Sequence, residues 1–209
     1  MTDQPVSSPS APASQWNIPN AITVSRLVMT FMLLGLMSAT DWWITAAVLF
    51  IVAAISDAVD GYLARKWNQI TTLGRILDPF VDKILVGGAF IFLTAQPESG
   101  VTPWLTFAVI AREMFITGLR SMMEQQGIDF SAKLSGKLKM ALQSVTAPVC
   151  LLSLSRPFLV WLGNWAPQFE ILRDVLLWGT LVITVYSGVE YTWRAWVISR
   201  KSASHIQVD

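Results

Sequence analysis

Cysteine, histidine and charge are all scarce in this sequence. The single cysteine, Cys150, excludes an internal disulfide and a cysteine metal cluster, and we expect a small buried apolar residue. The single histidine, His205, lies in the polar final segment, where we expect a solvated side chain without a functional role. Only 14% of the 209 residues are charged, whereas 53% are hydrophobic and the mean hydropathy is +0.50. This composition excludes an ordinary soluble domain and indicates a protein that crosses a membrane several times.

The two ends of the chain differ from its middle. Residues 1–15 are rich in Ser, Pro and Ala and are predicted to be disordered. No Lys or Arg precedes the first apolar run, which argues against a signal peptide. We therefore expect a disordered tail over 1–15, one transmembrane domain over 16–198 and a polar tail over 199–209.

Apolar segments long enough to cross a bilayer recur along the chain, since a hydrocarbon core of about 30 Å needs about 20 helical residues. Six segments qualify, at about 21–40, 42–64, 78–96, 103–121, 138–156 and 172–195. The connections at 40–41, 96–103 and 156–170 contain turn-forming residues. The predicted fold class is an all-α polytopic membrane protein with six transmembrane helices.

The charge-free stretches within the six segments are only 11 to 16 residues long, which is shorter than the segments themselves. Each predicted helix therefore has one charged end. The charges lie at the start of the first, third and fifth predicted helices and at the end of the second, fourth and sixth. Since successive helices alternate in direction, all six charged ends meet at one side of the membrane. Thirteen of the fifteen Lys and Arg lie there, and only Arg156 and Arg173 lie opposite. The positive-inside rule makes this side cytoplasmic, so we expect an inner (cytoplasmic) cell membrane protein with both termini and the active site on the cytoplasmic side.

Four aspartates lie between two apolar segments in "SDAVDGYLARKWNQITTLGRILDPFVDK". Asp57 and Asp60 are three residues apart, and Asp78 and Asp82 are four apart, so each pair shares one face of its helix. A short linker folds the two helices into a hairpin that brings the four carboxylates together. Carboxylate oxygens suit Mg²⁺ or Mn²⁺, with Ca²⁺ possible, and a pair of divalent ions would neutralise all four charges. The alternative, helix-end aspartates that reach for water, explains one such residue better than it explains four.

Small and polar residues flank these acids. Gly61, Ala64 and Gly74 leave room for a neighbouring backbone or a flat ligand, although helix packing explains them as well. Arg65 adds a positive charge suited to a phosphate. Three polar residues at the start of the first helix could line a nucleotide entrance, although helix capping and flanking charge explain them almost equally; they are Asn20, Thr23 and Arg26.

The stretch "DAVDGYLARKWNQITTLGRILDPFVD" matches the pattern D-x2-D-G-x2-A-R-x8-G-x3-D-x3-D at every fixed position. The chain therefore resembles the CDP-alcohol phosphatidyltransferases. Segments at 17–26, 68–83, 111–120 and 135–143 resemble the bacterial branch that makes phosphatidylglycerophosphate. Met140 departs from that branch, which usually has Thr there.

The resemblance implies a site with two Mg²⁺ or Mn²⁺ ions. Asp57, Asp60, Asp78 and Asp82 would hold the ions, and Asp82 would also act as the catalytic general base. CDP would be bound by Gly61, Ala64, Arg65 and Gly74, with Asn20 and Thr23 at the entrance. The implied substrates are CDP-diacylglycerol and sn-glycerol 3-phosphate, and the implied assembly is a homodimer among membrane lipids. We expect no nucleic-acid partner.

An anionic acceptor needs cations of its own. Four basic residues lie on the same predicted side as the aspartates, namely Arg112, Arg120, Lys137 and Lys139. An ion pair with an Asp or with the neighbouring Glu113 is the alternative role for Arg112, and ordinary positive-inside flanking is the alternative for Lys137 and Lys139. The acceptor could also be inositol phosphate, phosphatidylglycerol or serine. A divalent-cation transporter is the alternative of a different class, but it requires polar groups across the whole bilayer.

Overall fold

The chain is helical in nearly all of the residues that the structure, a computed structural model, describes. These residues are 18–39, 41–66, 72–128 and 134–206, and within them the side chains of 18–20, 58, 60–65, 72–76, 199 and 201–206 are left undescribed. The long helices are α1 (Ile18–Ala39), α2 (Trp43–Lys66), α3 (Thr72–Thr94), α4 (Pro103–Gln125), α5 (Leu134–Ser153) and α7 (Ala166–Ile206). Short helices occupy two connections, namely η1 (Pro97–Ser99), α6 (Arg156–Leu162) and η2 (Gly163–Trp165). The predicted all-α class is confirmed.

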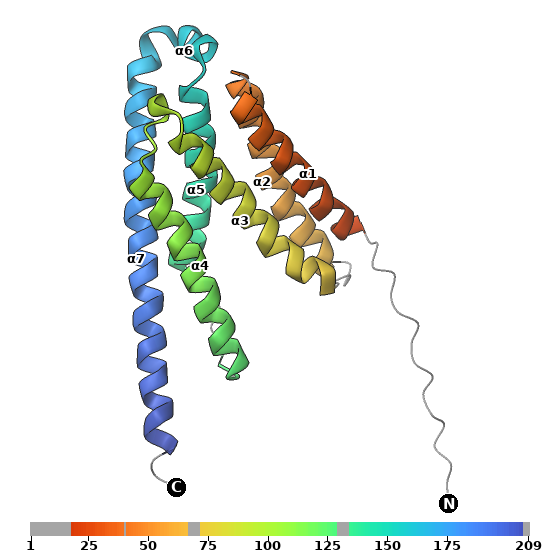
Figure 1. Cartoon of the computed structure of the whole chain (residues 1–209), viewed down its shortest axis with the longest axis vertical. Helices are drawn as coiled ribbons and strands as arrows, with labels where there is room; N and C mark the ends of the chain where they lie inside the picture. The colour runs from red at the N-terminus through yellow and green to blue at the C-terminus, as the bar shows by residue number, and fades with distance from the viewer. Residues whose placement is uncertain (1–17, 40, 67–71, 129–133, 207–209) are drawn as a thin grey trace, which may run out of the picture.

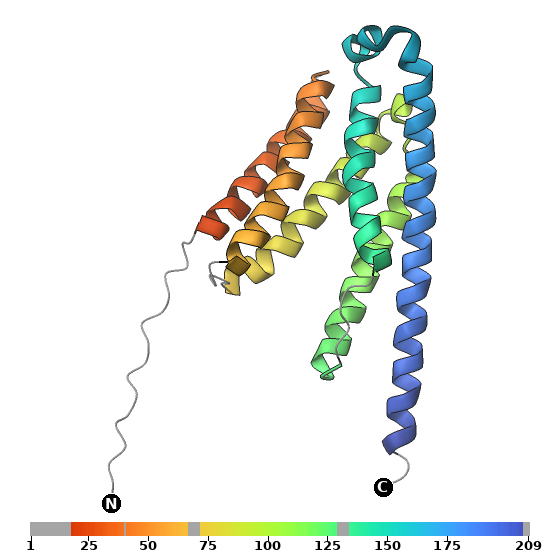
Figure 2. The ribbon, with the colours of Figure 1, turned by 180° about the vertical axis from the view of Figure 1, so that it is seen from behind.

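The helices form one bundle with two groups that share α3 (Figure 1). α1 packs along α2 and α3, whereas α5 packs against both α2 and α7, and α4 packs against α3 and α7. Seen from behind, α5 lies beside α7, and α6 with η2 joins them at one end of the molecule (Figure 2). We call the opposite end, where α1, α3 and α5 begin, the inner end.

Several helix boundaries follow from local sequence. Thr102 caps α4, where its side-chain oxygen accepts a hydrogen bond from the Leu105 amide at 3.3 Å. Ser155 caps α6 in the same way, with the Phe158 amide at 3.4 Å. Gly127 follows the end of α4 with a φ of +73°, a conformation that glycine adopts without a Cβ clash.

The hydrophobic core lies in the outer half of the bundle. It joins α1, α2, α3, α4, α5 and α7, and its fully buried members include Leu33, Phe50, Ala89, Phe90, Leu93 and Leu151. Toward the inner end the buried residues become polar, among them Thr23, Arg26, Lys139 and Gln143. The bundle is therefore packed and apolar at the outer end and carries its buried charge at the inner end.

The six long helices correspond in order to the six predicted segments, but their bounds differ. α3 begins at Thr72, six residues before the predicted start, and the predicted connection over 156–170 contains α6. α7 extends to Ile206, beyond the predicted end at 195, because residues 189–206 contain no Gly or Pro to stop it.

Hydropathy alone identifies fewer spans than the predicted six. Among the described helices only Ala21–Ala39 is a clear span by length and apolarity, and the number rises to two if α5 and the helical segment after its 92° bend are counted together. Charges at the inner ends shorten the apolar stretches of the other helices. Large apolar side chains nevertheless face outward along the bundle, including Phe31, Phe107, Trp178 and Val182.

Candidate active site

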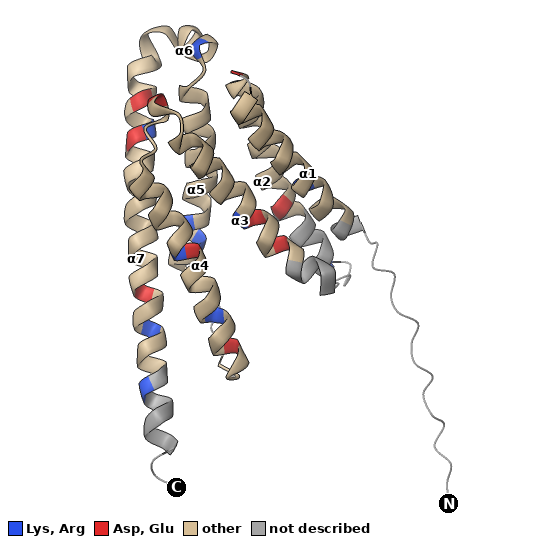
Figure 3. Cartoon of the chain, viewed as in Figure 1, with Lys and Arg blue, Asp and Glu red and all other residues tan. Residues whose placement is uncertain are grey.

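Acidic side chains from two helices line one cavity at the inner end. Asp57 lies near the end of α2, and Asp78 and Asp82 lie one turn apart near the start of α3. All three line a cavity of about 490 Å³. Asp57 and Asp78 are partly exposed, with 36% and 41% of their side-chain surface accessible. The predicted convergence of the α2 and α3 carboxylates is observed for these three residues, and Figure 3 shows the acidic positions on adjoining helices.

A buried arginine from α1 lies between two of these acids. Arg26 is fully buried, forms an ion pair with Asp57, and places a second guanidinium nitrogen 3.8 Å from the Asp78 carboxylate. Thr23, one turn earlier, donates a hydrogen bond of 2.7 Å to the same Asp78 oxygen. A buried charge needs a partner of opposite sign, so this contact fixes α1 against α2 and α3. The structure thus places Thr23 beside the acids.

A second charged cluster forms the opposite wall. Glu113 of α4 forms an ion pair with Lys139 of α5 and accepts a hydrogen bond of 2.8 Å from Arg112. Arg112 also donates to the Ser187 hydroxyl of α7 at 3.1 Å, and its guanidinium lies 5.5 Å from the centre of the Tyr191 ring. The alternative role considered for Arg112, an ion pair with Glu113, is therefore observed.

All four predicted acceptor-binding residues line the same cavity as the aspartates. Arg112 and Lys139 are engaged by Glu113, whereas Arg120 and Lys137 form no ion pair with a residue that the structure describes. Lys137 is exposed at the start of α5, and Arg120 is half-buried near the end of α4. The cavity therefore has an acidic wall on α2 and α3 and a basic wall on α4 and α5.

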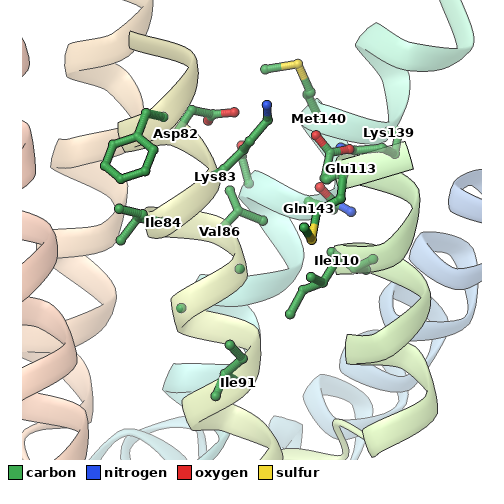
Figure 4. Close-up of a pocket in the computed structure, with 16 residues that line it drawn as sticks. Asp82, Lys83, Ile84, Val86, Ile91, Ile110, Glu113, Lys139, Met140 and Gln143 are labelled. Atoms are coloured by element: carbon green, nitrogen blue, oxygen red, sulfur yellow. The ribbon is translucent and has the colours of Figure 1, made fainter. Parts of the chain in front are cut away.

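A second, largely apolar cavity of about 400 Å³ adjoins the first between α3, α4 and α5 (Figure 4). The two cavities share lining residues, namely Asp82, Lys83, Glu113, Lys139 and Met140. Farther along α3 its wall contains Val86, Gly87 and Gly88. Asp82 therefore lies where a polar compartment meets an apolar one.

Several predicted residues lie outside the described side chains. They are Asn20, Asp60, Gly61, Ala64, Arg65 and Gly74. Their predicted roles in metal and CDP binding stay predictions.

The carboxylates that line the cavity are the described donors at the place where the sequence predicts a divalent-metal site. Among the described side chains, no three His, Cys, Asp or Glu residues lie close enough together to hold a metal ion. Three carboxylates nevertheless line one cavity, and a guanidinium already lies between Asp57 and Asp78 as a compensating cation. Hard oxygen donors of this kind fit Mg²⁺ or Mn²⁺.

Two features of the site were not predicted from the sequence. Tyr191, only 1% exposed, places its ring beside Arg112, and Gly136 lets α5 approach it closely, since a Cβ at 136 would lie 3.1 Å from the Tyr191 hydroxyl. The sequence gives one indication that Tyr191 and Gly136 belong to the site, which is that both lie at the charged ends of their predicted segments.

Comparison with known proteins identifies the family of this chain. The family model for CDP-alcohol phosphatidyltransferase matches residues 16–199. The CDP-diacylglycerol–glycerol-3-phosphate 3-phosphatidyltransferase of Bacillus subtilis (strain 168) is 34% identical over 197 residues, covering 87% of this chain and 96% of that protein. Proteins of the same name from Escherichia coli (strain K12) and Shigella flexneri serotype 5b (strain 8401) are 35% identical over 186 residues, covering 85% of this chain and 93% of theirs. The chain therefore belongs to the CDP-alcohol phosphatidyltransferase family of membrane-bound enzymes.

Proposed function

We propose that this enzyme transfers the phosphatidyl group of CDP-diacylglycerol to the primary hydroxyl of sn-glycerol 3-phosphate, giving phosphatidylglycerophosphate and CMP. The observation behind this proposal is that an acidic wall and a basic wall face one cavity of about 490 Å³ at the inner end. The names of the 34–35% identical relatives support the same donor and acceptor.

Asp82 is the proposed general base. Its side chain lines both cavities, so a hydroxyl in the polar cavity and a lipid-linked phosphate at the boundary can both approach it. The carboxylate accepts the hydroxyl proton while the acceptor oxygen forms a new bond to the lipid-linked phosphorus. The bond from that phosphorus to the bridging oxygen breaks, and CMP leaves with the electron pair.

The carboxylates of Asp57, Asp60, Asp78 and Asp82 are the proposed ligands of two Mg²⁺ or Mn²⁺ ions. Ions bound there would stabilise charge on the attacking and leaving oxygens of the diphosphate. Gly61, Ala64, Arg65 and Gly74 would shape the CDP pocket, with Asn20 and Thr23 at its entrance.

The phosphate of the acceptor is assigned to the basic wall. Arg120 and Lys137 have charge to spare for a ligand, because neither forms an ion pair with a described residue, whereas Arg112 and Lys139 share the single carboxylate of Glu113. A phosphorylated acceptor accounts for this wall better than serine does, whereas inositol phosphate carries the same charged group as glycerol phosphate.

All six long helices are proposed to cross the inner (cytoplasmic) cell membrane, with the inner end and both termini on the cytoplasmic side. The lipid chains then stay in the bilayer while CDP and acceptor meet at the cytoplasmic surface. A transport pathway is disfavoured, because the apolar cluster around Phe50, Phe90 and Leu151 fills the bundle beyond the cavity.

The decisive experiment supplies purified protein with CDP-diacylglycerol, Mg²⁺ or Mn²⁺, and one acceptor at a time, and measures CMP release. We expect release with sn-glycerol 3-phosphate and little with inositol phosphate, serine or phosphatidylglycerol. Release with a different acceptor alone would reassign the acceptor, and no release with any acceptor would refute the function.

The same assay tests the base. Asp82→Asn should lower kcat by at least about a hundredfold, because the amide cannot accept the proton. Glu124→Gln is the matched control, since Glu124 is an exposed acid lining the same cavity without an assigned role, and it should stay within about twofold of wild type. Equal losses in both variants would contradict the assignment.

A further inference from the structure

One buried amide in the apolar cavity lacks a partner. Gln143 of α5 is 2% exposed and lines the cavity between α3, α4 and α5. Its side-chain nitrogen is buried and has no hydrogen-bond partner among the described residues. Buried amides in proteins are almost always hydrogen-bonded, because leaving a donor without a partner costs free energy. A ligand in this cavity that carries a hydrogen-bond acceptor would supply the missing partner.

The position of Gln143 narrows the class of ligand. It lies four residues after Lys139 on the same helix, which places it about 6 Å farther from the inner end. The charged residues Asp82, Glu113 and Lys139 stand at the cavity mouth, and Figure 4 shows Gln143 below Glu113, with Ile110 and Ile91 farther along the wall. With increasing distance from the inner end, the cavity wall therefore presents charged groups first, then the Gln143 amide, and then hydrocarbon side chains.

A glycerophospholipid has the same order of groups. Its phosphate is charged, its ester carbonyls follow as hydrogen-bond acceptors, and its acyl chains follow as hydrocarbon. Side chains bordering the cavity face outward, with Phe80, Ile91 and Met114 each more than half exposed, so a lipid can enter sideways from the bilayer.

We propose that Gln143 donates a hydrogen bond to an ester carbonyl of the lipid donor, and so selects ester-linked over ether-linked substrates. This inference rests on the proposed function, because it takes CDP-diacylglycerol as the lipid. The chemical class recognised is a diacyl lipid, whose dialkyl analogue has an ether oxygen but no carbonyl at that position.

A merely structural role for Gln143 predicts something different. If the amide only supported the Glu113–Lys139 pair, a change at 143 would affect diacyl and dialkyl substrates equally. Recognition of a carbonyl predicts that only the diacyl substrate is affected.

The test measures CMP release in mixed micelles as a function of the mole fraction of CDP-diacylglycerol or its dialkyl ether analogue. Wild type should show a KM about fivefold lower for the diacyl lipid, the value of one neutral hydrogen bond. Gln143→Met, an apolar side chain of similar length, should raise the diacyl KM about fivefold and leave the dialkyl KM unchanged. Ser144→Ala, a change at the neighbouring position lining the same cavity, should preserve the wild-type ratio.

The outcomes separate the two hypotheses. An active wild type with equal KM values for both lipids would overturn the inference, whether or not the variant folds. A Gln143→Met enzyme that keeps the wild-type ratio would overturn it as well. No CMP release by wild type with either lipid would instead refute the proposed function.

Discussion

Lys137 and Lys139 are two residues apart, yet their surroundings differ. Lys139 is 2% exposed and paired with Glu113, whereas Lys137 is exposed and lines the cavity without an ion pair to a described residue. A buried paired lysine holds helices together, and an exposed unpaired lysine can exchange solvent for a phosphate. The sequence shows both as lysines beside a helix start, so only packing separates their roles.

Replacing Lys137 tests this difference. Lys137→Ala should raise the KM for sn-glycerol 3-phosphate about tenfold, through loss of a charge-assisted hydrogen bond, and change the KM for CDP-diacylglycerol by less than about twofold. Steady-state kinetics with each substrate varied in turn measures both values. Arg200→Ala removes a charge from α7 outside the residues that line the cavity and should alter neither. Equal rises in both KM values would move the phosphate site elsewhere.

The positions of three aspartates were predictable from the sequence, but their contacts were not. Spacing alone predicted that Asp57, Asp78 and Asp82 face one place, and the structure has them around one cavity. Spacing could not reveal Arg26 between Asp57 and Asp78, because that contact depends on how α1 packs against the hairpin. Gln143 lies in the segment 135–143 but has no role assigned from the sequence, since nothing in a sequence shows that an amide lacks a partner.

At the scale of the helices, the Glu113 cluster joins α4, α5 and α7 in the inner half. Glu113 belongs to α4, Lys139 to α5 and Ser187 to α7, with Arg112 bridging α4 and α7. Removing one partner of a buried ion pair costs more than removing both, because the remaining charge stays buried without compensation.

A double-mutant comparison tests this connection. Glu113→Gln should lower the free energy of unfolding by about 3 kcal/mol, and adding Lys139→Met should restore part of the loss, because Arg112 still lacks the Glu113 carboxylate. Thermal unfolding of the purified variants in detergent provides the measurement. Asp174→Asn breaks an ion pair whose acid is 56% exposed and should cost less than about 1 kcal/mol. A double variant no more stable than the single one would show that the buried charge is not the cause.

Helix number and order were predictable, but several boundaries were not. Apolar runs indicated the six long helices, because burial and lipid exposure both select apolar residues. α6 was missed because seven residues in a connection rich in Pro and Trp give no periodic signal. The start of α3 and the end of α7 extend past the apolar runs on polar residues, where helix propensity and capping decide the boundary.

At the scale of the whole molecule, charge is distributed unequally between the two ends. The clusters around Arg26 and Glu113 both lie toward the inner end, as predicted from the alternation of charged helix ends (Figure 3). The fold brings these clusters together because α1, α3 and α5 begin at the end of the bundle where α2, α4 and α7 finish.

Orientation in the membrane can be measured with introduced thiols. In sealed vesicles of known orientation, a membrane-impermeant maleimide should label Gln126→Cys only from the cytoplasmic side and Trp161→Cys only from the opposite side. Both positions are exposed, at opposite ends of the bundle. The native Cys150 is fully buried and should stay unlabelled, so the unmodified protein is the control. The reverse pattern would place the cavity on the other side.

Among the described residues, the apolar cluster around Phe50, Phe90 and Leu151 closes the bundle between the charged cavity and the outer end. On the proposed function, the acceptor and the released nucleotide therefore pass through the same face of the bundle, and the newly made headgroup stays in the leaflet from which its precursor came.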